Sequence, residues 1–550
     1  MSIPLKDQAA IRCRQLLSEL NREPTSSAYG CFDRRYWAWK LTDFPEATFQ
    51  RNLAALRWYF RQSQAEFQPA DAMEILRSGL EFTFKIQHRD GSFDQAFPNE
   101  HSFGATGFLL PDLITAYQAI KQDCCEVDRL LFESGLRHAA DFLARHSEQH
   151  GLISNHLAGA ALGLIKASAF FDEKRYVEKA RNLLDFILGK QTGEGWFPEY
   201  GGADPGYQTL CMHYLAQIYK LEPSKALKEA LQRSLAFLKY FAHPDGTFGG
   251  EYGSRRTEIY YPGGIALLAG EFQDASSLHH FMLPSIEAGN TVTLADVDMG
   301  NTAPLLTSTI IAAEYKTSKN KASALPFQQP LVNQEFPQAG IALRSRQKYY
   351  LVLGASNGGV VKVFKKRSGN LVLDDCGILG LDENNRKLTT QATRLDNSMQ
   401  TNENSLACES DFYALTNTLP NPFNYLVLRI LNLTLMRIGF LNEAIKKLMV
   451  GLLVKNSSRI AMSRKREITL DPQAIEITDT ILNPGKMRLK LLTQGFKFTA
   501  IHMASAHYFT PSQAAPPQAQ VLDHAALTSA GSLQVKKVIS FEKPALKSKP

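Results

Sequence analysis

The chain has 550 residues, 44% of them hydrophobic and 21% charged, a balance typical of a soluble globular protein and not of a disordered or membrane-embedded one. Its net charge of +7 comes from 61 Lys and Arg against 54 Asp and Glu, and no basic run indicates a nucleic-acid partner. The length exceeds that of one ordinary core, so we expect two domains.

The start of the chain lacks the apolar stretch of a secretory signal and passes directly into a helical pattern that begins around Ile11. The seven cysteines form neither a disulfide framework nor a zinc-ligand spacing. We therefore expect a reducing, cytoplasmic location.

Residues 1–315 carry apolar side chains at helical spacing, as in the segments around Leu157–Ile165 and Tyr176–Ile187. Three acidic-Gly-x-Phe signatures interrupt this pattern at multiples of about fifty residues, a length that fits a helical hairpin. They begin at Asp90, Glu194 and Asp245. The pattern predicts a ring of helical hairpins whose loops gather at one mouth and form a concave site.

Several polar residues lie where loops enter helices in this half. Asn155 and His156 follow Gly151, and each has an ordinary structural interpretation, as a helix cap or a core histidine. His101 opens another helix, after Asp94 and Glu100, and these three residues either cap that helix or line the site.

A loop dense in Gly and Pro runs from Gly195 to Gln208. Loops of this kind are expensive to order unless they shape a site. Trp196 and Phe197 offer flat faces for sugar rings, or they anchor the loop to the core.

Residues 316–330 have the composition of a linker, and beyond them the period changes to short apolar runs bounded by Gly and Asn. Because no helices separate these strands, residues 331–550 are predicted to form an antiparallel β-sandwich. The whole is an α+β multidomain chain.

Residues 423–454 interrupt the sheet pattern with an amphipathic helical segment, and basic residues continue to 466. Its charges exclude a simple transmembrane span. Two interpretations stay open: a helical excursion packed against its own domain, or a helix in peripheral contact with an anionic membrane at its inner face through 423–466.

The Asn155-His156 pair, the Gly-rich loop with Glu199, and Gly206-Tyr207 resemble the toroid half of the heparinase II/III-like and alginate lyase families. The resemblance spans nearly the whole chain and implies an N-terminal incomplete (α/α) toroid followed by a C-terminal antiparallel β-sandwich. It implies β-elimination at a uronate unit of an acidic polysaccharide or oligosaccharide. The missing secretory signal and the amphipathic segment favour a role in the making or trimming of a surface polysaccharide.

The resemblance also implies roles for individual residues. Asn155 and His156 would neutralise the uronate carboxylate, and Tyr207 would act as the base at C5, as the acid at the leaving oxygen, or as both. An arginine at 255 or 256 would hold a further anionic group. The remaining substrate contacts are assigned to Trp196, Glu199, Tyr200, Gln208, Tyr252 and His101.

The chain departs from that family in two places. Gln208 follows the tyrosine where a histidine is common, and residues 356–364 lack the histidine that supplies an imidazole and a zinc ligand in the family. Asp374 and Asp375 remain, but two carboxylates without imidazole partners make a poor zinc site. We therefore expect neither a metal nor another cofactor.

Alternatives remain open at this point. A uronyl C5-epimerase performs the same proton abstraction, and a non-catalytic polysaccharide-binding scaffold would keep the fold after losing the sheet-domain histidine. The signatures, with Gln87 before the first, also resemble repeats of terpene cyclases and prenyltransferases, but the Asp-rich acid motif and ring zinc site of those enzymes are missing.

Overall fold

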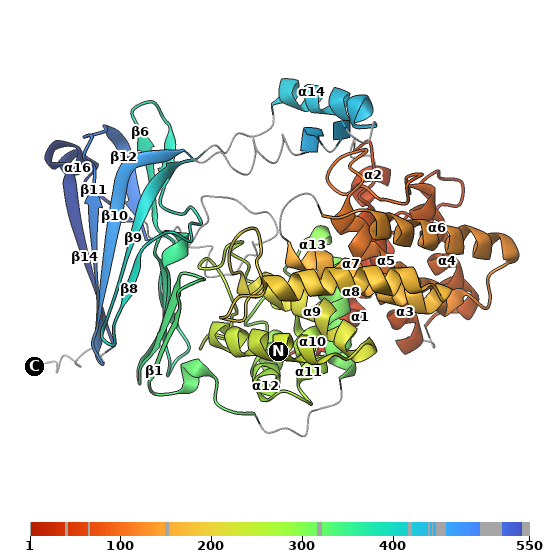
Figure 1. Cartoon of the computed structure of the whole chain (residues 1–550), viewed down its shortest axis with the longest axis horizontal. Helices are drawn as coiled ribbons and strands as arrows, with labels where there is room; N and C mark the ends of the chain where they lie inside the picture. The colour runs from red at the N-terminus through yellow and green to blue at the C-terminus, as the bar shows by residue number, and fades with distance from the viewer. Residues whose placement is uncertain are drawn as a thin grey trace, which may run out of the picture.

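The computed structural model describes residues 2–38, 42–63, 66–148, 153–315, 322–415, 421–437, 441–442, 444–446, 458–495 and 520–541. Figure 1 shows a helical N-terminal half beside a C-terminal half of strands. The change from helices to strands falls between Glu314 and Val332, and residues 316–321 of the predicted linker lie outside the described residues. The predicted order of toroid and sheet domain is confirmed.

Helices of the first half form two concentric layers. The inner layer consists of α3 (Asn52–Gln62), α5 (Phe103–Ile120), α7 (Ser154–Phe171), α9 (Pro205–Leu221), α11 (Pro262–Leu268) and α13 (Met299–Glu314). Each inner helix packs against the next, and α13 contacts α3, so that the two ends of the series meet. The outer layer consists of α1 (Leu5–Glu19), α4 (Pro69–Lys85), α6 (Glu126–Arg145), α8 (Lys174–Lys190), α10 (Lys225–Leu238) and α12 (Gln273–Ala288).

Composition explains which helices lie inside. In α7 small and apolar residues surround the whole helix, and almost all of them are buried, whereas α8 buries a single stripe that includes Tyr176 and Ile187. Glycines allow the inner helices to approach closely. A Cβ at Gly107 of α5 would lie 2.9 Å from Ala160 Cβ of α7.

The three signatures form the same turn in three hairpins. Gly91, Gly195 and Gly246 all have positive φ, between 89° and 95°, which glycine adopts without steric cost. A Cβ at Gly91 would lie 2.0 Å from the carbonyl oxygen of His138, so the turn packs directly on the backbone of α6. These signatures are therefore structural turns of a repeat.

The C-terminal half contains two antiparallel sheets. The first is the meander β1 (Val332–Phe336), β2 (Ile341–Ser345), β3 (Tyr349–Gly354), β4 (Val360–Lys365) and β5 (Leu371–Asp375). The second has the order β13-β12-β6-β7-β9-β10-β11-β14, with β8 beside β9. Its strands are β6 (Ile378–Asp382), β7 (Lys387–Thr389), β8 (Met399–Thr401), β9 (Ser405–Ala414), β10 (Arg459–Leu470), β11 (Ala474–Leu482), β12 (Leu489–Gln494), β13 (Gln520–Val521) and β14 (Ser532–Ser540).

The first sheet lies between the toroid and the second sheet. Side chains such as Leu343 and Tyr350 join the toroid core, whereas their neighbours Leu351 and Val361 join a core shared with Ile468 and Ile477 of the second sheet. Because both faces are covered, β2 and β3 are buried at every position. The predicted β-sandwich is confirmed, and one of its sheets forms the floor on which the toroid rests.

The described part of the helical insertion between β9 and β10 packs on the toroid. Its helix α14 (Pro422–Leu433) lies over the toroid beside α2 (Arg34–Trp37) (Figure 1). Arg429 Nη2 donates to Asp43 Oδ1 at 2.7 Å, and Asn99 Nδ2 donates to the carbonyl oxygen of Asn432 at 2.9 Å. The interpretation of an excursion packed against its own domain is thus wrong, because polar groups of the toroid rim fix the insertion. Residues 438–440, 443 and 447–457 lie outside the described residues.

Among the described residues, no helix combines the length and the apolar character that a membrane crossing requires.

Candidate functional site

Asn155 lies in the first turn of α7 and faces the Gly-rich loop. The start of α7 and the Gly-rich loop are joined by a β-bridge between Ile153 and Glu199. Ser154 Oγ also donates a hydrogen bond to the carbonyl oxygen of Pro198 at 2.8 Å. Asn155 Nδ2 donates to Glu199 Oε1, and Asn155 is only 2% exposed. The side-chain amide of Asn155, predicted to contact substrate, therefore donates to the buried carboxyl group of Glu199.

His156 is half-buried and points toward the end of α6. Its Nδ1 lies 2.7 Å from Glu148 Oε2, and its ring meets that of Phe108 edge-on at 5.1 Å. Gly104 makes room for this ring, since a Cβ there would lie 2.5 Å from His156 Nδ1. The imidazole is held by one carboxylate and one aromatic face.

Tyr207 and Arg255 are positioned by the same carboxylate. Asp204 caps α9, where it accepts from Tyr207 N at 2.9 Å, and it also accepts from Arg255 N at 2.8 Å. Asp-Pro-Gly at the start of a helix is a recognisable capping pattern, so the sequence contained this signal. The guanidinium of Arg255 lies over the ring of Tyr200 at 3.8 Å and over that of Tyr207 at 5.6 Å.

Glu199 and Tyr200 connect the two parts of the site. Burial, assisted by the negative charge of Asp204 and opposed by Arg255, raises the pKa of Glu199 to about 8. Burial also raises the pKa of Tyr200 to about 12, against the effect of Arg255 and with contributions from Glu199, Tyr207 and Glu148. The charges of these side chains therefore influence one another, and we call the group the tyrosine cluster: Glu148, Glu199, Tyr200, Tyr207 and Arg255.

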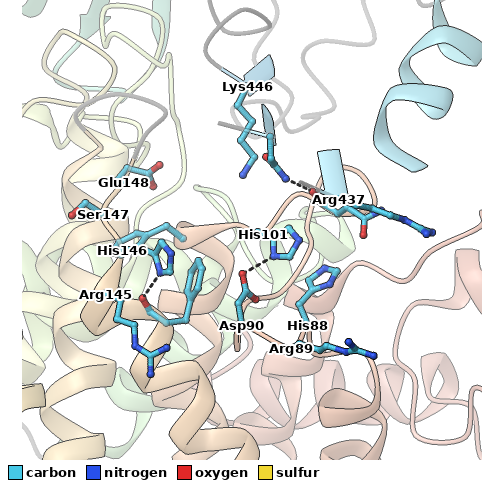
Figure 2. A pocket seen from close by; sticks show the side chains of 14 residues that line it. His88, Arg89, Asp90, His101, Arg145, His146, Ser147, Glu148, Arg437 and Lys446 are labelled. Carbon is cyan, nitrogen blue, oxygen red and sulfur yellow. Dashed lines mark hydrogen bonds and ion pairs between the residues drawn. The ribbon is translucent and has the colours of Figure 1, made fainter. Parts of the chain in front are cut away.

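Next to the tyrosine cluster lies a cavity of about 880 Å³ between the toroid rim and the insertion (Figure 2). The toroid supplies residues from two loops and the insertion supplies the opposite wall. The lining residues are His88, Arg89, Asp90, Asn99, His101, Phe103, Phe142, Arg145, His146, Ser147, Glu148, Arg437, Asn442 and Lys446. Because Glu148 also contacts His156, the cavity adjoins the predicted site.

His101 lines this cavity and does not cap the helix. The cap of α5 is Ser102, whose hydroxyl accepts from Ala105 N. His101 Nδ1 lies 2.7 Å from Asp90 Oδ2, and the ring stacks on His88 at 4.1 Å. Burial alone would raise the pKa of Asp90, but hydrogen bonds with His101 and Ser92 hold it well below its ordinary value.

His88 and Asp94 form a second histidine–carboxylate pair beside that of His101 and Asp90. Burial alone would lower the pKa of His88, but the carboxylate of Asp94, 2.8 Å from its Nε2, raises it above the ordinary value. Asp94 and Glu100 organise this loop through backbone amides: Asp94 accepts from His101 N, and Glu100 accepts from Gln95 N.

Two residues predicted to bind substrate belong to the framework of the Gly-rich loop. Trp196 is 4% exposed, lies in the toroid core and donates through Nε1 to Glu194 Oε2 at 2.9 Å. Gln208 is buried as well, since it accepts from Phe197 N at 3.2 Å and donates to the carbonyl oxygen of Gly195 at 3.0 Å. Both side chains therefore anchor the loop, and their contact with substrate stays a prediction.

Tyr252 and Arg256 are buried between the toroid and the sheet domain. Tyr252 is fully buried, and its hydroxyl lies 2.8 Å from His243 Nε2. Arg256 donates to the carbonyl oxygen of Gln391 in the sheet domain, and burial lowers its pKa to about 10. Both side chains thus contribute to the packing of the domains, and their contact with substrate stays a prediction. Tyr200, Arg255 and His101 are partly exposed, and their roles toward substrate stay predictions.

A buried ammonium occupies the place where the sheet domain could have held a cation. Ligand atoms of Glu251, Asp374 and Cys376 lie within 4.8 Å of one another. Lys362 Nζ lies among the carboxylates, 2.5 Å from Glu251 Oε2, 3.2 Å from Glu258 Oε1 and 3.9 Å from Asp374 Oδ2. These residues do not fit zinc, because the lysine already supplies the positive charge and no imidazole joins the group.

Sequence reasoning missed most of the cavity. A weak signal was present, since six of the 13 histidines fall between residues 88 and 156. The contribution of Arg437 and Lys446 carried no signal, because it depends on where the insertion docks.

Comparisons with known proteins agree with this architecture. The family model of the ulvan lyase N-terminal domain matches residues 72–265, about a third of the chain. Among solved structures, the chain is similar to the chondroitin AC lyase of Streptomyces coelicolor A3 in complex with chondroitin sulphate, at 12% identity and a TM-score of 0.56. That match covers 88% of this chain and 67% of the other.

A tyrosine-to-alanine mutant of the Streptomyces enzyme is similar at 11% identity, with the same coverage and a TM-score of 0.54. Heparinase III matches at 11% identity, covering 88% of this chain and 72% of the other, with a TM-score of 0.49. No curated protein sequence matches the chain. Residues 72–265 thus match an ulvan lyase N-terminal domain, and the chain has the helical-toroid and antiparallel-sheet fold of the polysaccharide lyases.

Proposed function

We propose that this protein cleaves an acidic polysaccharide by β-elimination at a uronate unit. The observation that carries the proposal is the match of residues 72–265 to an ulvan lyase domain, because this range contains Asn155, His156 and Tyr207. Solved structures similar to this chain include a lyase in complex with chondroitin sulphate, which is an acidic polysaccharide.

The chemistry assigned to the site requires three tasks. A base removes the proton at C5, the C4–O bond breaks as the C4–C5 double bond forms, and a proton goes to the leaving oxygen. The uronate carboxylate must be neutralised so that negative charge at C5 is tolerated.

Tyr207 is our candidate for both proton transfers, since the Asp204 cap holds its backbone N–H at the start of α9. Arg255, which lies against Tyr200 and Tyr207, is our candidate to neutralise the carboxylate through a charge-assisted hydrogen bond. His156, whose Nδ1 contacts Glu148, is our candidate to assist, and Asn155 contacts the loop through Glu199.

The test is the appearance of the ultraviolet absorbance of an unsaturated uronate when the protein is incubated with ulvan, chondroitin sulphate, heparin or alginate. Tyr207→Phe should lower this rate at least about a hundredfold, the lower end for loss of a general acid or base. The control is Tyr36→Phe, which changes a partly buried tyrosine in α2 and leaves the site intact. Equal rates for Tyr207→Phe and the unmodified protein would refute the assignment.

A non-catalytic polysaccharide binder is the second candidate. The carboxylates that surround Lys362 favour this binder, because Lys362 already neutralises them and the described residues of this group include no imidazole for catalysis. Binding of a polymer with neither absorbance nor uptake of solvent deuterium at C5 would decide for the binder. Deuterium uptake without absorbance would indicate a C5-epimerase.

We further propose that the protein acts in the cytoplasm at an anionic membrane surface, in the making or trimming of a surface polysaccharide. The seven cysteines are free thiols, which supports a reducing compartment. Helix α14 supports the membrane contact: Arg429 is turned to the toroid, whereas Phe423, Leu426 and Ile430 are exposed, Phe423 by 71%.

Sedimentation with phosphatidylglycerol vesicles tests the membrane contact. We expect Phe423→Ser with Ile430→Ser to release the protein from the vesicles. Val127→Ser with Leu130→Ser removes two apolar side chains of α6 that are at least as exposed as Phe423 and Ile430, respectively, and should not release it. Identical sedimentation of both variants would contradict the proposal.

A further inference from the structure

The cavity of Figure 2 is built by two domains that lie far apart in the sequence. Asn99 has a left-handed backbone, with φ of 58°, and it holds the insertion from both sides. Its side chain donates to the carbonyl oxygen of Asn432, and its own carbonyl oxygen accepts from Asn442 Nδ2 at 2.7 Å. The position of the wall that carries Arg437 and Lys446 is therefore fixed by hydrogen bonds.

The described lining of this cavity carries more positive than negative charge. Among the described lining residues, the permanent cations are Arg89, Arg145, Arg437 and Lys446, and the carboxylates are Asp90 and Glu148. Both carboxylates already lie 2.7 Å from an imidazole, that of His101 for Asp90 and that of His156 for Glu148. Arg145 is itself paired with Asp141, whose Oδ2 lies 3.4 Å from Arg145 Nη2. The remaining excess of positive charge, from Arg89, Arg437 and Lys446, faces the cavity, where it attracts an anion.

Figure 2 shows how these cations are arranged. Lys446 points from the insertion into the space between Glu148 and His101, although its side chain is only 9% exposed. The arginines lie along the margins. His146, stacked on Phe142 at 4.4 Å, adds a flat face of the kind that packs against a sugar ring.

We propose that the docked insertion completes a subsite for an oxyanion, a sulphate ester or a carboxylate, carried by a sugar next to the one that reacts. The subsite rests on the proposed action on an acidic polysaccharide. Glu148 joins it to His156, so a chain whose uronate lies at Tyr207 and Arg255 can extend a neighbouring anionic group toward Lys446. The volume of about 880 Å³ suits one or two sugar units.

The test measures the Kd of the full chain for sulphated polymers (ulvan, chondroitin sulphate, heparin) and for a polymer with carboxylates alone (alginate). Lys446→Met keeps the length and the packing of the side chain but removes the charge, and it should weaken binding about tenfold. The matched control is Lys490→Met, on the exposed face of β12. Arg89→Ala with Arg437→Ala, both exposed, provides a second variant that avoids the buried position.

If the variants bind only the sulphated polymers more weakly, the anion is a sulphate ester. If they also bind alginate more weakly, the subsite accepts a carboxylate. Unchanged Kd values for both folded variants would overturn the subsite, as would a wild-type protein that binds none of these polymers. Binding that depends on Lys446 without any ultraviolet product would leave the subsite standing and refute the lyase activity instead.

Discussion

Charged side chains gather in two regions of this molecule, and the regions differ in where their partners lie. In the sheet domain, Arg466 is fully buried and contacts Asp375 at 2.5 Å and Asp479 at 2.7 Å, and Lys362 is enclosed by carboxylates. At the toroid rim, Arg89 and Arg437 are exposed on the margin of a cavity whose carboxylates are already engaged. Self-neutralised clusters stabilise the fold, whereas an open excess of one sign is available to a ligand.

Removal of the Lys362 ammonium should have the largest effect on stability of the changes that test this comparison. Lys362→Met leaves the carboxylates of Glu251, Glu258 and Asp374 buried without their cation, so we expect the free energy of unfolding to fall by about 3 to 5 kcal/mol. Chemical denaturation measures it. Lys490→Met is the control, and equal stability of the two variants would contradict the role of Lys362.

Glu199 gives a pH dependence of known sign. Its pKa is raised from 4.5 to about 8 by folding, so its proton stabilises the folded state below pH 4.5, and this contribution is lost as the pH rises through about 8. The difference between wild type and Glu199→Gln in free energy of unfolding should shrink by on the order of 3 kcal/mol from about pH 5 to about pH 7.5. A difference that grows with pH would refute the raised pKa.

Gln208 should behave as a framework residue and not as a ligand. Gln208→Leu leaves the amide of Phe197 without its acceptor, which costs about 1 to 3 kcal/mol of stability. Gln232→Leu, on the exposed face of α10, is the matched control. Loss of polymer binding by Gln208→Leu at unchanged melting temperature would restore Gln208 as a substrate contact.

The smallest effect on stability is expected at the cavity itself. Arg89→Ala removes an exposed guanidinium, so the free energy of unfolding should change by no more than about 0.5 kcal/mol. Thermal denaturation checks this. A large loss would place Arg89 among the self-neutralised cations of the fold.

Much of the architecture could be predicted from periodicity, because the spacing of apolar residues records which side of an element is covered. The helices around Leu157 and Tyr176 follow the predicted pattern, as do the strands at Tyr349 and Val360. The same pattern could not tell what covers the exposed side. The insertion is amphipathic whether it rests on sheet or toroid, and the polar rim at Asp43 and Asn99 decided its place.

The site was harder to predict, because a side chain's type does not record its direction. Trp196 is as suitable for a sugar ring as for a core, and only the fold turned it inward. Lys362 and Glu251 lie more than a hundred residues apart, and their contact depends on the docking of the two domains. By contrast, the capping pattern at Asp204 was local and could have been recognised.

The enclosed lysine has one further consequence for the molecule as a whole. Glu251 and Glu258 come from the toroid, whereas Lys362 and Asp374 come from the sheet domain. Pulling the halves apart would leave both sets of charges without compensation at the moment of separation. Heating should therefore melt both halves in a single calorimetric transition, with no intermediate in which one half survives alone.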